Sequence, residues 1–416
     1  MKNILLITTI YPHFDGVNHG TPVCHFFTRE WVAMGYNVRA VHLQNVFPAP
    51  FYWAAKLFRT KIAARTGAVV YTERDKGGRF NVDGVSICRI PILKAVPHGG
   101  FSARVVRKAV KEIIAYCNET EFTPDLVIGH FSNPIIDVVS QLKAKYNVPD
   151  CIVMHGDIEM TKRVYGERLP EIMSNIDCWG FRNRHDGEMF ERNIAKVERK
   201  FICYSGIPAQ YIAERNDRMF EGPLRKFIYV GEMIDRKYPD RVLEALGKAY
   251  PENDFELTYV GAGQRLENIR KMAEENNWTE NVHCLGKIKR DDINAQYDAA
   301  DCMVMISSGE AYGLVYLEAM ARGCITIASR NEGFDGVIED GVNGFLCKAG
   351  DATELAAIIQ RINNMTAEER LRISNNAWQT AKGLTDRLAA ERYIEDVKKL
   401  NKLNINNLSP TGGVNQ

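Results

Sequence analysis

Two glutamates, Glu310 and Glu318, lie eight residues apart between two apolar segments, 302–306 and 325–328. Small residues precede the first glutamate and the second falls within an expected helix, so the stretch is predicted to form a parallel strand–loop–helix–strand unit. Eight residues of helix span about 12 Å, too far for both carboxylates to act on one atom. They could instead hold two ends of an extended ligand, because carboxylates accept hydrogen bonds that vicinal sugar hydroxyls donate. The helix N-terminus beside the loop also favours phosphate.

The segment EAYGLVYLE (310–318) is followed by AMARG, an apolar strand and DGVNGFL. In this order the stretch resembles the E-x7-E signature of retaining glycosyltransferase family 4, the glycosyl transferases group 1, which have the GT-B fold. A bare E-x7-E spacing is common by chance, and then it marks only a helix with a surface glutamate. The flanking segments therefore carry the resemblance. It implies that Glu310 faces the donor sugar in the catalytic site and that Glu318 binds the nucleotide ribose.

Further donor-site candidates follow strands in the second half of the chain. By the same resemblance, Lys237 neutralises the donor diphosphate. The family usually has an arginine five residues before that lysine, whereas this sequence has Glu232 there. A carboxylate at that position repels a diphosphate unless a cation such as the neighbouring Arg236 pairs with it. The donor-binding candidates implied by the resemblance are Gly231, Lys237, Gly261, Gly263, Lys287, Ile288, Gly313, Leu314 and Glu318.

Candidates for the acceptor side come from the first half of the chain. His130 and His155 each stand where an expected strand ends. A lone histidine is commonly structural, but His155 matches a family position near the acceptor and the transferred sugar, and it is the second catalytic-site candidate. His130 and Asn133 match a less strict acceptor-side position. Gly16 and Gly20 lie in the loop after the first strand, where glycine allows close approach of the backbone to a ligand, although a plain surface turn is the alternative.

The length of 416 residues predicts two domains, and alternating strands and helices predict an α/β fold with mostly parallel sheets. The resemblance implies the GT-B arrangement: two Rossmann-like domains facing an interdomain cleft, with a C-terminal helix crossing back to the first. We expect an acceptor-binding domain over 1–205 that includes a helix at about 389–408, a donor-binding domain over 206–388, a linker at 214–225 and a disordered tail at 409–416. Strands of the first domain are expected at 3–9, 38–43, 69–73, 85–90, 126–130, 152–155 and 201–204.

Composition narrows the class of protein. The formal net charge of +1 argues against a dedicated nucleic-acid binder, which normally carries a basic excess. The ten cysteines are scattered without a CxxC pair, as is typical of free thiols in a reducing cytoplasm. The short apolar run at the N-terminus reads as a buried strand rather than a signal peptide, and no other segment is long and apolar enough to cross a bilayer. We therefore expect a cytoplasmic protein that is either soluble or bound to the surface of a membrane.

Two segments favour contact with a membrane surface. Residues 46–66 combine aromatic and basic residues without any acid, and residues 104–111 carry four bases on one predicted helical face. Apolar rings beside cations suit an interface with anionic lipid or with a polyprenyl diphosphate acceptor. The alternatives are that the aromatic side chains pack inward and that the bases are simply solvated. The bases of the second segment are Arg104, Arg107, Lys108 and Lys111.

The expected reaction, by resemblance, is transfer of a hexosyl unit from a nucleotide-diphosphate sugar, such as a UDP- or GDP-sugar, to a hydroxyl of a glycan or lipid-linked acceptor. The anomeric configuration is retained, and the setting is bacterial surface polysaccharide synthesis. No cofactor or metal is expected, since no metal-binding DxD motif is present. Two alternatives stay open: a nucleotide-sugar epimerase of related fold, and a catalytically weak partner subunit, which Glu232 suggests.

Overall fold

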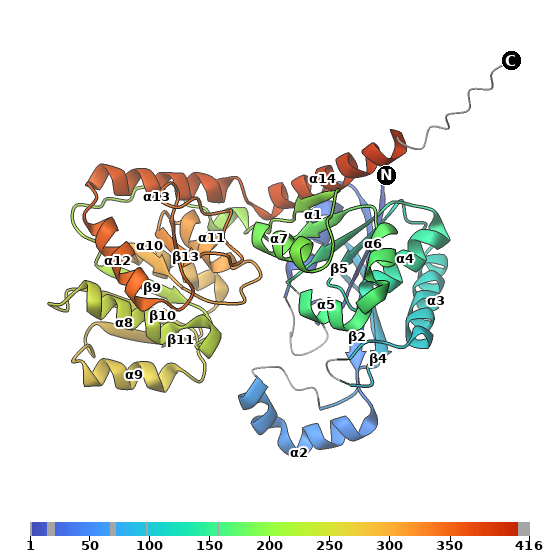
Figure 1. The fold of residues 1–416 in the computed structure, drawn as a ribbon, viewed down its shortest axis with the longest axis horizontal. Helices are drawn as coiled ribbons and strands as arrows, with labels where there is room; N and C mark the ends of the chain where they lie inside the picture. Colours follow the sequence, from blue (N-terminus) through green and yellow to red (C-terminus); the bar gives the residue numbers. More distant parts are fainter. Residues whose placement is uncertain (1, 15–20, 67–71, 97–98, 157, 407–416) are drawn as a thin grey trace. The chain divides into compact units, whose positions relative to one another are not determined.

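The computed structural model describes residues 2–14, 21–66, 72–96, 99–156 and 158–406. The chain divides into two compact units (Figure 1). Unit 1 contains residues 1–182 and 186–203 together with the chain from 389 on, and unit 2 contains residues 183–185 and 204–388. Each unit is built on one sheet, as the alternating pattern of the sequence predicts.

The sheet of unit 1 has eight strands in the order β3-β4-β2-β1-β5-β6-β7-β8. Among the described residues the pairs are parallel except for the β3–β4 hairpin, which lies at one edge. The strands are β1 (Asn3–Thr8), β2 (Asn37–Val46), β3 (Gly78–Val82), β4 (Val85–Leu93), β5 (Leu126–His130), β6 (Asp150–Met154), β7 (Trp179–Phe181) and β8 (Lys200–Ile202).

Side chains of β1 show how both faces of this sheet are buried. Ile4 and Leu6 belong to a core cluster with helices α1 (Val23–Ala33) and α14 (Asp386–Asn406). Leu5 and Ile7 belong to a second cluster with α3 (Ala103–Glu119) and α4 (Ile135–Tyr146). Alternate residues of a strand point to opposite faces, so an uninterrupted apolar strand needs helices on both sides. The other helices of this part of the chain are α2 (Ala49–Thr66), α5 (Ile158–Tyr165), α6 (Leu169–Ser174) and α7 (Arg184–Asn193).

Two strands of unit 1 were not expected from the sequence, and one expected strand is not found. β7 has three residues and β3 is a half-exposed edge strand, so neither shows a readable hydrophobic period. Of the strand expected at 69–73, residues 67–71 lie outside the described residues, and residues 72 and 73 are not in a strand.

The sheet of unit 2 has six parallel strands in the order β11-β10-β9-β12-β13-β14. They are β9 (Lys226–Val230), β10 (Glu256–Val260), β11 (Val282–Gly286), β12 (Cys302–Val304), β13 (Ile325–Ser329) and β14 (Phe345–Cys347). The helices are α8 (Pro239–Ala249), α9 (Leu266–Glu275), α10 (Ile293–Ala299), α11 (Leu314–Ala321), α12 (Ala352–Asn363) and α13 (Ala367–Lys382), with 3-10 turns η3 (Asp235–Lys237) and η4 (Arg290–Asp292).

The last helix, α14, packs on the sheet of unit 1, as the resemblance implied. Trp31 Nε1 donates a hydrogen bond of 3.0 Å to the carbonyl oxygen of Ala390. The ring of Tyr393 meets that of Phe27 edge to face, with centroids 5.1 Å apart. Because apolar residues of α14 complete the core on the α1 side, this helix is an integral part of unit 1.

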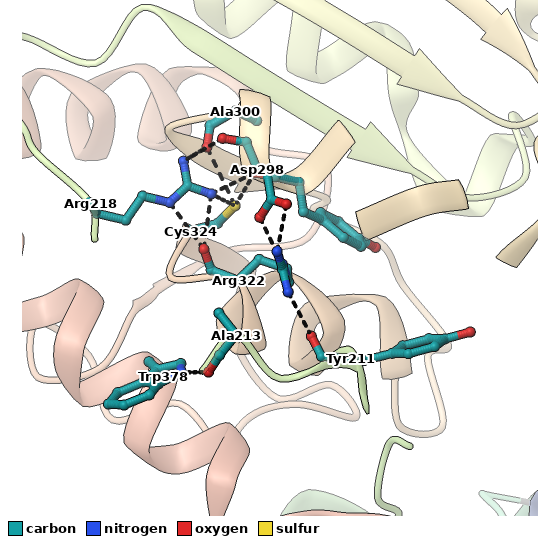
Figure 2. Close-up of polar contacts among 9 residues, drawn as sticks. Tyr211, Ala213, Arg218, Asp298, Ala300, Arg322, Cys324 and Trp378 are labelled. Carbon is teal, nitrogen blue, oxygen red and sulfur yellow. Dashed lines mark hydrogen bonds and ion pairs between the residues drawn. The ribbon is translucent and has the colours of Figure 1, made fainter. Parts of the chain in front are cut away.

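Residues 214–225, expected to be a linker between the domains, belong instead to unit 2 and are anchored on it. Figure 2 shows the Arg218 guanidinium among backbone carbonyls, and it donates to the carbonyl oxygens of Tyr297 and Ala300 at 2.6 Å each. Arg322, whose carbonyl oxygen accepts a further bond from Arg218 Nε, pairs in turn with Asp298. The prediction was wrong because a charged composition is typical of linkers, whereas here one arginine satisfies carbonyls around the end of α10.

Candidate active site

Three neighbouring strands of unit 2, β10, β9 and β12, end at the same edge of the sheet, and glycines there let their exit loops meet. A Cβ on Gly261 would lie 1.9 Å from the carbonyl oxygen of Gly231. A Cβ on Gly263 would lie 2.3 Å from the carbonyl oxygen of Met233. Gly261 also has φ +143, which L side chains rarely adopt. These glycines are therefore required by backbone packing at the edge where an α/β sheet binds its ligands.

The exits of β9 and β12 bring the predicted lysine and glutamate together. Lys237 ends the turn η3 after β9, and its Nζ lies 3.2 Å from Oε2 of Glu310 in the loop after β12. The two side chains are 13% and 16% exposed, so the pair is shielded but reachable. The backbone N–H of Glu310 donates to the carboxylate of Glu332 at 2.8 Å, which fixes the loop. The structure thus joins two candidates that lie far apart in the sequence.

Arg236 is a second cation at this place that sequence reasoning did not assign to the site. Its Nη1 lies 4.0 Å from Oε2 of Glu310 and donates to the carbonyl oxygens of Ser308 and Gly309 at 3.3 Å. The expected pairing of Arg236 with Glu232 is therefore replaced by contacts with the loop after β12. Glu232 itself is exposed. For Arg236, the only sign in the sequence that it could join the site was its position directly before Lys237.

Glu318 is buried on α11, with 4% of its surface exposed. Arg290 holds it: Nη2 and Nε both donate to Oε1, at 2.7 and 3.1 Å. Burial raises the pKa of Glu318, and the Arg290 guanidinium opposes that rise. Gly313 caps the N-terminus of α11 with φ +87, where a Cβ would meet the Tyr316 ring at 2.5 Å. The helix can therefore start directly after the loop that carries Glu310.

The remaining donor-site candidates are less enclosed. Leu314, the first residue of α11, is partly exposed. Lys287 follows β11 and is exposed, whereas Ile288 is partly buried and packs against the core of unit 2. A backbone contact with a nucleotide base at these two residues stays a prediction.

In unit 1, the adjacent strands β5 and β6 bring the two predicted histidines together. His130 Nδ1 lies 3.0 Å from His155 Nε2, and His130 Nε2 lies 3.2 Å from the hydroxyl of Tyr393 on α14. The Phe131 ring stacks on the His155 ring at 4.0 Å. Burial, with a smaller contribution from the charge of Arg182, lowers the pKa of His130 to about 3, and burial lowers that of His155 as well. Both rings are therefore neutral at pH 7 and can exchange hydrogen bonds but not charge.

Asn133, the other described acceptor-side candidate, is 8% exposed and donates from Nδ2 to the carbonyl oxygen of Gly99 at 3.1 Å. Gly16 and Gly20 lie outside the described residues. Sequence reasoning missed Tyr393 and Arg290, the partners of His130 and Glu318. Each is an unremarkable member of a polar or amphipathic segment, so no pattern in the sequence could have marked them.

Comparison with known proteins gives a family for the second unit. Residues 212–380 match the family of glycosyl transferases group 1. An uncharacterized glycosyltransferase of Methanocaldococcus jannaschii is 24% identical over 280 residues, which cover 66% of this chain and 74% of that protein. The amylovoran biosynthesis glycosyltransferase AmsK of Erwinia amylovora is 23% identical over 82% of this chain and 86% of its own length. The crystal structure of HepE from Anabaena in complex with UDP covers 96% of this chain and 100% of HepE, with a TM-score of 0.65 and 16% identity.

The two parallel-sheet units and these structural neighbours define the fold as GT-B. Residues 212–380 form a glycosyl transferases group 1 domain, and the protein is a glycosyltransferase.

Proposed function

We propose that this protein is a retaining glycosyltransferase that moves a hexosyl unit from a nucleotide-diphosphate sugar to a hydroxyl of a glycan or lipid-linked acceptor. The observation that carries the proposal is the Lys237–Glu310 pair at 3.2 Å, at the exits of adjacent strands, with buried Glu318 on the following helix. One cation for phosphate and two carboxylates for hydroxyls match the parts of a nucleotide sugar.

In this proposal unit 2 binds the donor. Lys237 and Arg236 neutralise the diphosphate as it leaves, and the N-terminal N–H groups of α11 add to that stabilisation. Glu310 accepts hydrogen bonds from hydroxyls of the sugar, and Glu318 does so from the ribose. The departing phosphate takes the proton of the acceptor hydroxyl on the same face of the sugar, so the configuration is retained. The protein cations fill the charge-neutralising role that a metal has in other transferases.

The acceptor side is assigned to unit 1. His155 is a neutral, partly exposed ring at the exit of β6 and can exchange hydrogen bonds with hydroxyls of the acceptor or of the sugar in transfer. His130, which is more deeply buried, contacts His155 through the Nδ1–Nε2 pair at 3.0 Å and so helps to orient its ring. AmsK acts in amylovoran biosynthesis by its name, and a role in bacterial surface polysaccharide synthesis is our proposal for this chain.

A nucleotide screen tests the donor site. We expect one of UDP, GDP, ADP and CMP, or one of their sugars, to raise the midpoint of thermal unfolding. A ligand at 100 times its Kd stabilises by about 2.7 kcal/mol, which corresponds to several degrees for a protein of this size. The shift should shrink in Glu318→Gln, which loses the charged acceptor for the ribose.

The outcomes of the screen separate the alternatives. A shift that is equal in wild type and Glu318→Gln contradicts the assigned ribose site. Absence of a shift with every nucleotide favours the partner-subunit alternative, in which exposed Glu232 weakens donor binding. Conversion of the donor into an isomeric nucleotide sugar without acceptor favours the epimerase alternative.

We also propose that helix α2 contacts a membrane with anionic headgroups. Trp53, Leu57 and Phe58 on this helix are 71%, 60% and 50% exposed, whereas Tyr52 and Ala55 face inward. The sequence of this segment contains no acid, and its described base, Lys56, is exposed, with Nζ 3.8 Å from the carboxylate of Glu73 outside the helix. On α3 the bases of the predicted stripe are exposed, and Val106, Val110 and Ile113 are buried. No helix in the described part of the chain is long and apolar enough to span a bilayer.

Cosedimentation with vesicles tests this contact. At low salt the protein should pellet with vesicles that contain phosphatidylglycerol and much less with phosphatidylcholine vesicles, because attraction to anionic lipid is electrostatic and adds to apolar burial. Trp53→Ser with Leu57→Ser should reduce the bound fraction several-fold, since two exposed apolar anchors are lost. A matched control is Leu388→Ser, which removes another exposed apolar side chain. Equal pelleting of wild type and the α2 variant would exclude this surface.

A further inference from the structure

Arg290 holds the carboxylate of Glu318 at one of its two oxygens. Nε and Nη2 of Arg290 both donate to Oε1, at 3.1 and 2.7 Å. Arg290 belongs to η4, which precedes α10, and its guanidinium lies 5.4 Å from the centroid of the Tyr211 ring. The guanidinium beside the Tyr211 ring, with two hydrogen bonds to Oε1, anchors that oxygen of the carboxylate.

The second oxygen, Oε2, keeps its capacity to accept hydrogen bonds. The hydroxyl of Tyr297 lies 3.5 Å from Oε2 but 3.2 Å from the carbonyl oxygen of Val315. A tyrosine hydroxyl has one proton, so its contact with Oε2 is a long hydrogen bond that competes with the nearer Val315 carbonyl. Glu318 Oε2 therefore keeps at least one lone pair for a ligand, while Oε1 accepts two hydrogen bonds from Arg290.

The charge of Glu318 depends on the same contact. The side chain is 4% exposed, and burial alone favours the neutral carboxyl. The titratable groups that face it are Arg290 from η4, Tyr297 from α10 and Asp386 from the start of α14. Asp386 acts in the same direction as burial, whereas Arg290, and to a smaller extent Tyr297, lower the pKa of the carboxyl and favour its charged form.

We propose that Arg290 is a positioning residue for recognition of the nucleotide ribose: it keeps Glu318 ionised and turned so that Oε2 receives the ribose hydroxyls. The inference rests on the proposed function, which assigns the ribose to Glu318, and it adds the residue that makes this assignment work. Arg290 does not itself contact the nucleotide in this proposal. If Glu318 binds the ribose hydroxyls in this way, the protein should prefer ribonucleotides over 2′-deoxyribonucleotides.

Calorimetric titration with UDP and with 2′-deoxy-UDP tests the proposal. Wild type should prefer UDP by about tenfold or more, because a hydrogen bond to a charged group is lost with the 2′-hydroxyl, and this ratio should be constant between pH 6 and 8. In Glu318→Gln the ratio should fall towards one. In Arg290→Gln the pKa of Glu318 rises further, so the ratio should be reduced at pH 8 and should fall again towards pH 6. Arg290→Lys keeps the charge and should restore a ratio that does not change with pH.

The outcomes separate the inference from the proposed function. If Glu318→Gln keeps the wild-type ratio, the ribose is not bound by Glu318, and both fail. If Glu318→Gln loses the ratio but Arg290→Gln keeps it at every pH, only the role of Arg290 is overturned. Where the thermal screen identifies another nucleotide than UDP, that nucleotide and its 2′-deoxy analogue serve as the probes, and failure of every pair to bind contradicts both proposals. Thermal unfolding of each variant verifies its fold, and Arg290→Lys remains informative if Arg290→Gln does not fold.

Discussion

Replacement of Lys237 by alanine is expected to weaken binding of a nucleoside diphosphate by about 10- to 100-fold, with little effect on the nucleoside alone. A hydrogen bond to a charged group contributes about 1.5–3 kcal/mol, and Lys237 is the more buried of the two cations beside Glu310. The effect should exceed that expected for a surface lysine because the pair is only 13% and 16% exposed, where water screens charge poorly.

The variant also changes the charge that a diphosphate meets. Without Lys237, the remaining cation beside Glu310 among the described residues is Arg236 at 4.0 Å, and the carboxylate then repels the incoming phosphates. The same loss applies to the leaving group during transfer, where removal of one stabilising donor commonly costs 100- to 1,000-fold in rate.

Titration calorimetry with UDP and with uridine, or with the nucleotide found in the thermal screen, measures this difference. Lys271→Ala is the matched control, since Lys271 lies on α9 of the same unit and pairs with Glu275 on the surface. Its UDP affinity should stay within about twofold of wild type, as expected for an exposed pair. Equal losses for UDP and uridine in Lys237→Ala would indicate general damage to the pocket rather than a diphosphate contact.

The stability of His130→Gln should approach that of wild type as the pH falls. His130 is fully buried, and its pKa in the folded protein is about 3. In the unfolded chain a histidine takes up a proton near pH 6.5. Between these values the unfolded state binds the additional proton, so His130 makes wild type less stable as the pH decreases.

Once the histidine of the unfolded chain is protonated, the free energy of unfolding of wild type should fall relative to that of the variant by about 1.4 kcal/mol per pH unit. At pH 8 the variant should be less stable, because its amide replaces a ring that bridges His155 and Tyr393. From pH 6 to pH 4.5 the difference in the free energy of unfolding between wild type and His130→Gln should decrease by about 2 kcal/mol. Buried groups away from His130, such as Asp150, titrate equally in both proteins. His155 contacts His130, but burial is the largest cause of its lowered pKa and is present in both proteins.

Urea unfolding of wild type and of His130→Gln at a series of pH values gives a curve of the free energy of unfolding against pH for each protein. His283→Gln provides the control, because His283 is exposed on β11 and the same substitution there replaces a surface ring instead of a buried one. Parallel curves for wild type and His130→Gln would show that His130 takes up its proton in the folded state.

Local patterns were sufficient for much of the fold. The helix expected at about 389–408 lies within α14, Asp386–Asn406, as far as the structure describes it, and the strands expected at 126–130 and 152–155 correspond to β5 and β6. The three-residue β7 and the edge strand β3 were missed, since short or half-exposed strands carry little periodicity. The charged segment 214–225 was misassigned, because composition does not distinguish a solvated arginine from one that binds backbone carbonyls.

The amino-acid sequence by itself determined the alternation of strands and helices, the glycines at strand exits, and the two glutamates that flank a helix N-terminus. These depend on interactions within a few residues, which periodicity and turn chemistry record. Only the tertiary structure decided the partners: Lys237 for Glu310, Arg290 for Glu318, and Tyr393 for His130. Periodicity reports which face of an element is buried but not what covers it. The order of strands in a sheet and the packing of a distant helix choose the partner, and the partner sets the charge and orientation of each site residue.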